Sequence, residues 1–461
     1  MGLTGSRPAG LPTLPAHTDP GTDRIMDSGL LHELSHAFDG PFHYLLPHRF
    51  DANLAAFRAA LDDAGVAGHV YYAKKANKAA VWAERCAAHG AGVDVASVPE
   101  LREALGHGVR GEHIIVTGPA KNDALLRLAV LHGCLVAVDA LDELDLLSTL
   151  ALTGTVRPAR LLLRRLPSDQ PHSRFGMTAA EADTALDRCV RAGDALRMEG
   201  FSFHLSGYAT RPRADLAAQL IDACLRAREL GLRADRISIG GGFAVDYSSG
   251  GHWHAFLAAQ RPEHYHAHRT FDADGFYPYH SPVAGADALR AILDTVPDGG
   301  RTSLAGRLKE TGTLLLTEPG RALLDGAGAS VFRVQGVKER DGYRILTVDG
   351  TSLSLSEQWF NSEYLPDPYL VTPDGRARGS AVHPACVGGA TCLESDLLTW
   401  RKVPFPARPR AGDLLVYPNT AGYQMDSNES PFHGLPLPPK VVVDRVNAAR
   451  PRWRLDRSPA R

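Results

Sequence analysis

The sequence predicts a (β/α)8 barrel followed by a mostly β domain, and two observations carry this prediction. From about residue 48 to 328, short apolar runs alternate with longer segments in which apolar residues recur at the helical period. After residue 328, short apolar runs broken by Gly and Pro follow one another instead. A doubly wound open sheet is built from the same strand and helix units. The count of eight repeats favours the barrel.

Each expected strand of the barrel is a short run rich in apolar and β-branched residues. Between the runs lie segments such as "NDALLRLAVLHG" and "RADLAAQLIDACLRARELG", which are typical of amphipathic helices. In chain order the strand runs are "HVYYAK", "AGVDVAS", "HIIVTG", "LVAVDA", "ARLLLRR", "GFSFHLS", "DRISIGGG" and "LLLTEPG".

The remaining boundaries follow from composition and turn signals. Residues 1–28, rich in Gly, Pro and Thr, are expected to form a disordered leader, and 448–461 a loose tail. A strand within 29–47 is expected to join the C-terminal β domain, which spans 329–447. The barrel carries an insertion at about 243–301, whose position predicts a lid or substrate-pocket element over the barrel mouth.

The overall composition excludes several classes of protein. Hydrophobic residues make up 44% of the chain and charged residues 22%, and the net charge is −2, so we expect neither a nucleic-acid nor a membrane partner. No apolar run is long enough to span a bilayer. Six cysteines without a CxxC pair indicate a reducing compartment, so we expect a cytoplasmic protein.

Polar or glycine residues recur where the expected barrel strands end. Active-site groups of such barrels lie at the carboxyl ends of the strands. Each of these residues alone is better explained by a turn or a helix cap, but the full set predicts a site. In order, the strand ends carry Lys75, Asp94, Thr117, Asp139, Arg164, His204, Gly240–Gly242 and Glu318.

Lys75 suggests covalent chemistry, because a lysine at a strand end can form a Schiff base with a carbonyl of a substrate or of pyridoxal phosphate. The second option needs a phosphate cradle, a group stacked on the ring and a partner for the pyridine nitrogen. The glycine run 240–242, His204 and Glu318 are candidates for these roles, with Arg321 as a phosphate ligand. A tight turn explains the glycines about as well, and a histidine in an apolar strand is more often a core residue.

Eight short motifs resemble those of the fold-type III PLP-dependent decarboxylases, in the same order and over roughly residues 40 to 445. This family includes ornithine, arginine and diaminopimelate decarboxylases. The resemblance implies a PLP-binding (β/α)8 barrel with a C-terminal β domain, decarboxylation at the α-carbon of an amino acid, pyridoxal 5'-phosphate as cofactor, and a homodimer with active sites at its interface. The motifs are "YAKKAN", "GVDVAS", "HSRFGM", "GFSFHLSG", "ISIGGGF", "TEPGR", "CLESDLL" and "NTAGY".

The resemblance also implies roles for individual residues. The family pattern Y-A-x-K-A-N aligns with residues 72–77, which assigns the Schiff-base lysine to Lys75 rather than Lys74. Cys392 matches the proton donor that approaches from the partner subunit, and His204 matches the residue stacked on the ring. Further cofactor contacts are implied for Asp94, Arg164, Gly240, Gly241, Gly242, Glu318, Arg321 and Tyr423, and substrate contacts for Cys392, Glu394 and Asp396.

Two other functions share this fold. Racemases place an arginine near the pyridine nitrogen and use a tyrosine as second acid or base, whereas this chain has Glu318 and Cys392, which favours decarboxylation. A non-catalytic PLP-binding or regulatory homologue is the other alternative. The presence of the C-terminal domain and of Cys392 argues against it.

The sequence departs from the family in three places. Leu393 stands where diamino-acid decarboxylases usually have Asp or Glu, and Gly207 stands where the ornithine and diaminopimelate enzymes tend to have a serine. The insertion contains His264, His266 and His268, for which aromatic packing onto the barrel is a better explanation than a metal site, so no metal is expected. A position in a solvated loop is a better explanation of Arg211 and Arg213 than the binding of a substrate carboxylate.

Overall fold

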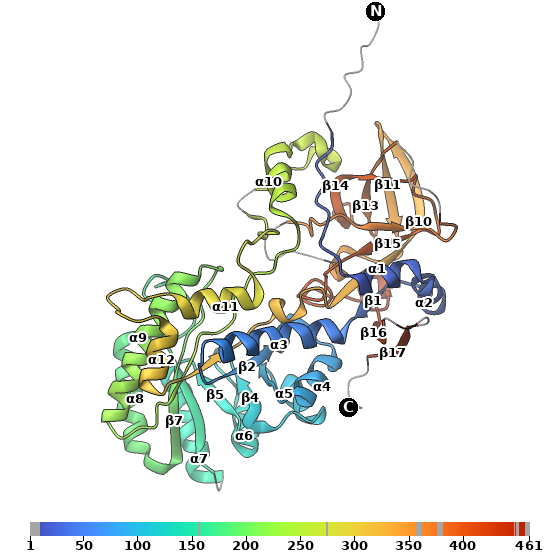
Figure 1. Ribbon diagram of the computed structural model, residues 1–461. Helices are drawn as coiled ribbons and strands as arrows, with labels where there is room; N and C mark the ends of the chain where they lie inside the picture. Colours follow the sequence, from blue (N-terminus) through green and yellow to red (C-terminus); the bar gives the residue numbers. More distant parts are fainter. Residues whose placement is uncertain are drawn as a thin grey trace, which may run out of the picture. The chain divides into compact units, whose positions relative to one another are not determined.

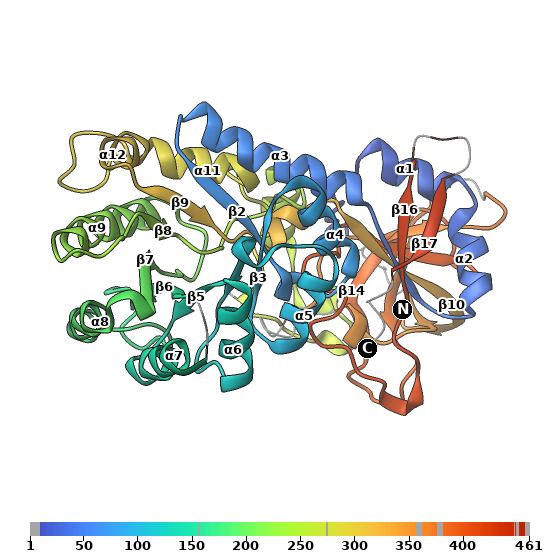
Figure 2. The same ribbon diagram turned by 90° about the horizontal axis from the view of Figure 1, so that it is seen from below.

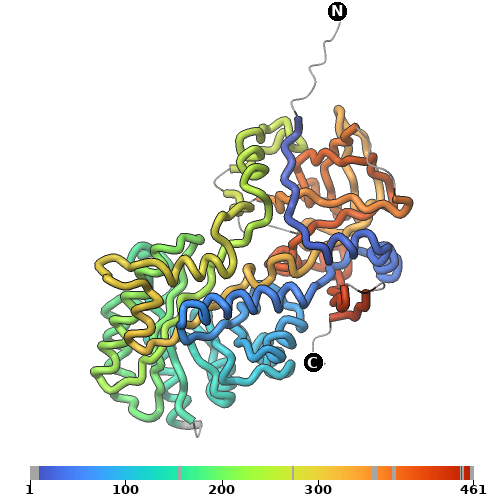
Figure 3. The backbone as a smooth tube through the Cα atoms, in the orientation of Figure 1, coloured from blue at the N-terminus to red at the C-terminus, as the bar shows by residue number. Residues whose placement is uncertain are grey.

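The computed structural model describes residues 10–154, 157–272, 275–355, 362–375, 381–446, 448 and 451–456. The chain divides into two compact units, each described here by itself. The barrel unit consists of Phe50–Ala244 and Val283–Leu323 (Figure 1). The β unit consists of the described residues up to Arg49, with Val245–Pro282 and Leu324–Asp456. Figure 3 follows the chain by colour as it passes between the units.

Eight parallel strands close into a barrel in sequence order, and the last strand pairs with the first. They coincide with the eight runs expected from the sequence, which confirms the barrel. Most of their residues are buried, as expected for parallel strands covered on both faces. The strands are β2 (Gly68–Ala73), β3 (Gly92–Val95), β4 (Ile114–Val116), β5 (Leu135–Val138), β6 (Ala159–Arg164), β7 (Leu196–Ser202), β8 (Arg236–Ser238) and β9 (Leu314–Thr317).

Helices surround the strands of the barrel unit (Figure 2). Inside the barrel, Tyr71, Ile115, Leu135, Leu162 and Leu316 form one buried cluster, which fills the interior with side chains. The helices are α3 (Pro47–Asp63), α4 (Ala80–His89), α5 (Val98–Gly106), α6 (Asp123–His132), α7 (Leu141–Gly154), α8 (Ala179–Ala192), α9 (Thr210–Glu229), α11 (Gly285–Asp294) and α12 (Leu304–Thr311), with the short 3-10 helices η1 (Lys74–Ala76), η2 (Gly111–His113) and η3 (Gly193–Ala195).

Side-chain caps fix where several of these helices begin. Ser97 accepts a hydrogen bond from the Glu100 amide at the start of α5, and Asn122 accepts one from the Leu125 amide at the start of α6. Thr178 begins α8 with a complete capping box to Glu181. These caps set the length of the loops that leave the strand ends, where the candidate residues lie.

The β unit is built on one mixed sheet, in the order β14-β13-β11-β10-β1-β16-β17, with β15 paired to β10 and β12. Asp341 and Gly342 connect β10 to β11 with positive φ at both positions, as a tight hairpin requires. The strands are β1 (Phe42–Leu45), β10 (Gly328–Arg340), β11 (Tyr343–Val348), β12 (Tyr369–Val371), β13 (His383–Gly388), β14 (Leu397–Phe405), β15 (Leu414–Tyr417), β16 (Lys440–Asp444) and β17 (Arg452–Leu455).

Both chain ends are more ordered than the sequence predicts. The leader expected over 1–28 contains helix α1 (Pro20–Asp27), which Asp19 caps and whose Ile25 is fully buried with residues of α2 (Leu30–Phe38). The expectation is wrong there because tertiary burial outweighs a Gly- and Pro-rich composition; residues 1–9 lie outside the described residues. In the tail, β17 pairs antiparallel with β16, so the expectation of a loose tail is wrong for that segment too.

Most of the insertion, residues 245–282, belongs to the β unit, which corrects the expectation that the whole segment 243–301 is inserted in the barrel. Residues 245–282 contain α10 (Gly250–Ala259), η4 (Pro262–His264) and η5 (His266–His268). Tyr247 and Tyr279 pack edge-to-face with Tyr364, at ring-centroid distances of 6.1 and 5.7 Å. This packing against aromatic residues of the β unit explains the placement, whereas α11 and α12 belong to the barrel.

Two features of the described residues bear on function. No group of three or more His, Cys, Asp and Glu side chains there is arranged to hold a metal ion, and the three insertion histidines lie in short 3-10 helices rather than on a strand. None of the described helices combines the length and the apolar character needed to cross a bilayer.

We expect Thr178→Ala to destabilise the first turn of α8 by about 1 kcal/mol, because the substitution leaves its amides without the capping oxygen. Hydrogen exchange of the α8 amides measures this directly. Thr184→Ala on the same helix is the matched control, since its exposed hydroxyl bonds only the Ala180 carbonyl. Equal exchange in the two variants would contradict the capping role.

Candidate active site

The barrel brings most of the predicted residues together at the carboxyl ends of its strands. Because the strands are parallel and closed, these ends form a single rim. The predicted residues on this rim are Lys75, Asp94, Arg164, His204, Gly240, Gly241, Gly242, Glu318 and Arg321. Cys392, Glu394, Asp396 and Tyr423 belong to the β unit.

Lys75 is held by a buried carboxylate. Its Nζ lies 2.6 Å from Asp94 Oδ2, and the other Asp94 oxygen accepts a hydrogen bond from the Thr117 hydroxyl at 2.5 Å. Asp94 is 2% exposed, whereas the Lys75 side chain is 49% exposed. The amine is therefore oriented by the protein and still open to a bound molecule.

Lys74 turns the other way. It is 1% exposed, and its amine donates to Glu103 Oε1 at 3.0 Å and to the Lys78 carbonyl at 3.2 Å. Both lysines lie in η1, and Asn77 stabilises the turn that follows by accepting a bond from the Ala79 amide. The separation of the two lysines agrees with the alignment that selects Lys75.

Glu318 is a buried acid at the end of β9. Its Oε1 accepts a 2.5 Å hydrogen bond from the Ser238 hydroxyl at the end of β8. Burial foremost, and then the nearby Asp94 charge, raises the pKa of Glu318 to about 7, although Ser238 and Lys75 oppose the shift. Arg321 follows three residues later and is also buried. A cation or a protonated ring nitrogen beside Glu318 would favour its ionised form.

His204 follows β7 and is exposed to solvent. Desolvation by surrounding protein atoms, and then the positive charges of Lys75, Arg164 and Arg213, lowers the pKa of His204 to about 3. The imidazole is therefore neutral at pH 7, which suits stacking against an aromatic ring better than proton transfer.

The three glycines after β8 are required by their neighbours. A Cβ at Gly240 would lie 2.9 Å from His204 Nδ1, and one at Gly241 would lie 2.7 Å from the Glu318 carbonyl oxygen. Gly240 and Gly242 also have positive φ, at 65° and 80°. The loop therefore runs as bare backbone beside two candidate residues, which is the geometry that a phosphate cradle needs.

Arg213 lies beneath this loop, not in a solvated loop as the sequence suggests. It is on α9, is 1% exposed, and donates to the carbonyls of Leu205, Gly207 and Ala209. A side chain at Gly242 would clash with its guanidinium. Burial lowers the pKa of Arg213 to about 10. The arginine thus holds the His204 loop against the glycine loop.

A second buried ion pair lies on the same rim. Arg164 Nη1 is 3.1 Å from Asp139 Oδ1, which also accepts a bond from the Gly176 amide at 3.1 Å. The guanidinium carbon lies 4.5 Å from the centroid of the Phe175 ring. The "HSRFGM" motif is therefore folded over the end of β6 by these contacts.

In the β unit, the loop that carries Cys392 is organised by Asp396. This buried carboxylate accepts bonds from the Thr391 hydroxyl at 2.7 Å and the Ser352 amide at 2.7 Å. Cys392 and Glu394 are exposed. All six cysteines of the chain lie in described segments, and Cys392 is the one that is exposed. Asp396, for which the resemblance implies a substrate contact, thus orders the loop, and the Cys392 thiol is exposed to solvent.

Tyr423 lies in a strained turn of the same unit. Its φ is 77°, a left-handed value that is costly for a side chain with a Cβ. Its carbonyl accepts bonds from the Ser427 hydroxyl and amide, which stabilise the turn. The ring is half-buried.

A cavity of about 420 Å³ lies beside the Cys392 loop, within the β unit. Leu393, Phe271 and Trp400 form the apolar part of a wall that also contains polar side chains such as Arg269 and Ser362. Glu363, which is 5% exposed, also lines it, and its Oε1 has no hydrogen-bond partner among the described residues. Burial raises the pKa of Glu363 to about 7.

Sequence reasoning missed three of these residues. Ser238 precedes the glycine run on a strand, and the pairing of β8 with β9 is what brings it to Glu318. Arg213 gave a misleading signal because arginines after a strand are usually solvated. No local sequence signal distinguishes Glu363, because its burial depends on how the β unit folds around it.

Comparisons with known proteins agree with this geometry. Residues 48–262 match the family model described as pyridoxal-dependent decarboxylase, pyridoxal binding domain. An uncharacterized protein of Sinorhizobium fredii is 37% identical over 92% of this chain and 92% of its own length. Diaminopimelate decarboxylase of Actinosynnema pretiosum is 29% identical over 89% of this chain and 85% of its own.

Solved structures share the fold. Diaminopimelate decarboxylase from Helicobacter pylori, complexed with L-lysine, superposes with a TM-score of 0.71 at 18% identity, covering 91% of this chain and 93% of its own. Lysine/ornithine decarboxylase from Vibrio vulnificus, complexed with cadaverine, gives a TM-score of 0.68 at 22% identity, covering 90% and 98%.

The raised pKa of Glu318 predicts a pH-dependent stability of the ligand-free protein. The folded state binds this proton more tightly than the unfolded state does, so the stabilisation is full below about pH 4.5 and is lost as the pH rises to about 7. Glu318→Gln removes this pH-dependent loss in the free energy of unfolding, which is on the order of 3 kcal/mol.

Denaturant unfolding at pH 5 and pH 7.5 measures the effect, with the exposed Glu310→Gln as control. We expect the stability of Glu318→Gln to fall less between the two pH values than that of wild type and of the control. Parallel curves for all three proteins would show that Glu318 has an ordinary pKa.

Proposed function

The chain belongs to the pyridoxal-dependent decarboxylase family, and we propose that it removes the α-carboxyl group of an amino acid with Lys75 as the lysine that binds pyridoxal phosphate. The observation that carries this proposal is the exposed Lys75 amine, 2.6 Å from the buried Asp94 and on the same rim as the buried Glu318. No other arrangement of lysine and acids on this rim combines an open amine with buried partners in the described chain.

The rim residues fit the cofactor. When bound, pyridoxal phosphate supplies an electron sink for the charge left at Cα. Glu318 is suited to hold a proton between itself and the ring nitrogen, because its pKa near 7 allows either state. The neutral His204 is suited to cover the ring face. The backbone of the glycine loop and Arg321 are suited to hold the phosphate, with Tyr423 as the ligand that the resemblance adds.

Asp94 and Arg164 complete the electrostatic setting. Asp94 keeps the Lys75 ammonium oriented until the amine reacts, and Thr117 fixes the carboxylate in turn. Arg164 is positioned by Asp139 and adds positive charge to the rim. The charges of Asp94 and Arg164 both influence the pKa of Glu318. The protonation of Glu318 is therefore coupled electrostatically to the groups around the Lys75 amine.

We propose that Cys392 delivers the proton to Cα after the carboxyl group leaves, in a homodimer in which the thiol serves the partner's barrel. Its exposure and its ordered loop support this role. The carboxylate at position 318 supports decarboxylation over racemisation, because an acid favours the protonated, electron-withdrawing ring.

The loop beside Cys392 also bears on the substrate. Leu393 is 52% exposed and presents an apolar side chain where a carboxylate would hold a distal ammonium group. We therefore propose an amino acid without a terminal ammonium group, whose side chain packs against Leu393, Phe271 and Trp400 in the cavity beside the Cys392 loop. Release of CO2 from a panel of amino acids, followed by mass spectrometry, tests this. Loss of chirality without CO2 release would identify a racemase instead.

We expect Lys75→Ala to abolish the visible absorbance band of the protein-bound cofactor, since the described Lys74 and Lys121 amines are buried in ion pairs of their own. Lys74→Met is the matched control: it removes the neighbouring amine, loses the contact with Glu103 and is expected to be less stable, yet to keep the band. Retention of the band in Lys75→Ala with loss in Lys74→Met would shift the assignment by one residue.

We expect Cys392→Ala to lower kcat by about 10²- to 10⁴-fold, the range typical of a general acid, while cofactor affinity stays unchanged. Cys189→Ala, which removes a buried thiol on α8, is the control for the loss of a thiol elsewhere in the chain. Turnover is measured as CO2 release, and cofactor affinity by absorbance titration. Full turnover in Cys392→Ala would exclude the thiol as proton donor.

A further inference from the structure

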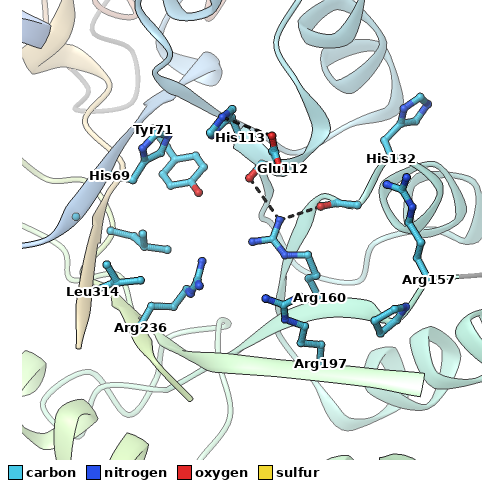
Figure 4. A pocket seen from close by; sticks show the side chains of 14 residues that line it. His69, Tyr71, Glu112, His113, His132, Arg157, Arg160, Arg197, Arg236 and Leu314 are labelled. Atoms are coloured by element: carbon cyan, nitrogen blue, oxygen red, sulfur yellow. Dashed lines mark hydrogen bonds and ion pairs between the residues drawn. The ribbon is translucent and has the colours of Figure 1, made fainter. Parts of the chain in front are cut away.

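A cavity of about 560 Å³ opens at the amino ends of the barrel strands, opposite the rim that carries Lys75. Its walls come from the starts of β2, β6, β7, β8 and β9 and from the residues before β4 and β5. This volume lies within the range of small-molecule sites. Figure 4 shows its side chains, among which arginines predominate.

Three of the arginines that line this cavity share the carboxylate of Glu199, which is not itself part of the lining. Glu199 is fully buried, and Arg160 binds it in a bidentate manner at 2.8 and 3.0 Å. Arg197 Nε and Arg236 Nη1 each lie 3.0 Å from the same carboxylate. One negative charge therefore faces three positive charges, which leaves a local surplus of positive charge beside the cavity.

Other acids near the cavity do not remove this surplus. Among the described residues that line it, Glu112 is the one acid, and it forms an ion pair with Arg110 outside the lining. Asp235 pairs with Arg236 and also with Arg233. Glu112 and Asp235 thus each have another arginine as a partner, so they do not neutralise the positive charge around Glu199.

Several hydrogen-bond donors point at the cavity without a partner. Neither terminal nitrogen of Arg197 bonds to any described residue, and its side chain is 40% exposed. The Tyr71 hydroxyl likewise has no partner among the described residues, and Figure 4 shows it on the same side as the Arg236 guanidinium. Burial raises the pKa of Tyr71 to about 12, so the hydroxyl keeps its proton.

The cavity is separated from the cofactor end of the barrel. Tyr71 and Leu316 line it and also belong to the buried cluster that fills the barrel interior. A molecule bound here would therefore rest on an apolar floor with arginines around it, and would not be part of the active site.

We propose that this cavity binds a small anion with at least two negative charges, a phosphorylated or polycarboxylate metabolite. Guanidinium groups bind phosphate and carboxylate through paired N–H donors, and a dianion would balance the surplus around Glu199. The donors of Arg197, Arg236 and Tyr71 come from three different strands, so they would enclose the anion from separate sides. The proposal does not depend on which amino acid the enzyme acts on.

Calorimetric titration of the cofactor-loaded protein with pyrophosphate and with citrate, at constant ionic strength, tests the proposal. The variant is Arg197→Gln, which leaves the Arg160 and Arg236 contacts with Glu199 in place. The matched control is Arg191→Gln, which makes the same charge change on the exposed face of α8. The two probes distinguish a phosphate ligand from a carboxylate ligand.

We expect saturable binding of at least one probe to wild type and to Arg191→Gln, and affinity at least 10-fold weaker for Arg197→Gln. Tyr71→Phe removes one donor without a change in charge and is expected to weaken binding about threefold, so it tests the same site if Arg197→Gln does not fold. Equal affinity in the cavity variants and wild type would overturn the proposal. The proposal would also be overturned if neither probe bound saturably to wild type. It would likewise be overturned if binding of a probe were accompanied by loss of the cofactor absorbance.

Discussion

The pairing of β9 with β2 is the contact on which the site depends, because it closes the sheet into a barrel. The two strands run parallel in a register that sets Gly68 beside Leu315 and Val70 beside Thr317. Closure brings the residue after the last strand, Glu318, to the same rim as the lysine after the first. An open sheet with the same strands would leave these two groups at opposite edges.

Electrostatics distinguishes the two ends of this barrel. At the carboxyl end, the buried carboxylates of Asp94 and Glu318 share a small volume with Lys75 and Arg164, and the pKa of Glu318 reflects their balance. At the amino end, three arginines surround Glu199, and positive charge is in excess. A layer of apolar side chains separates the two ends.

Sequence reasoning succeeded where local pattern determines structure. The eight strands rest on short-range signals that the fold preserves. The selection of Lys75 over Lys74 rests on the family resemblance and stays a prediction. Sequence reasoning failed where burial by distant segments decides the outcome. The helix Pro20–Asp27 and the insertion are ordered by packing within the β unit, which composition does not report.

The roles of individual residues divide in the same way. The position of Glu318 follows from its strand, but its raised pKa follows from burial and from Asp94, which lies on another strand. Arg213 resembles a surface residue in the sequence, yet it lies beneath the glycine loop because three backbone carbonyls accept its guanidinium. Such contacts depend on chain closure and have no signature in a single segment.

Lys75 is the lysine that we propose to carry the cofactor. Borohydride reduction of the cofactor-loaded protein makes the lysine linkage permanent, and peptide mass spectrometry then locates the added pyridoxyl group. We expect the group on Lys75, in the peptide that also contains Lys74 and Lys78, with fragment ions that separate the three. A pyridoxyl group on Lys74, Lys78 or the buried Lys121 would contradict this assignment.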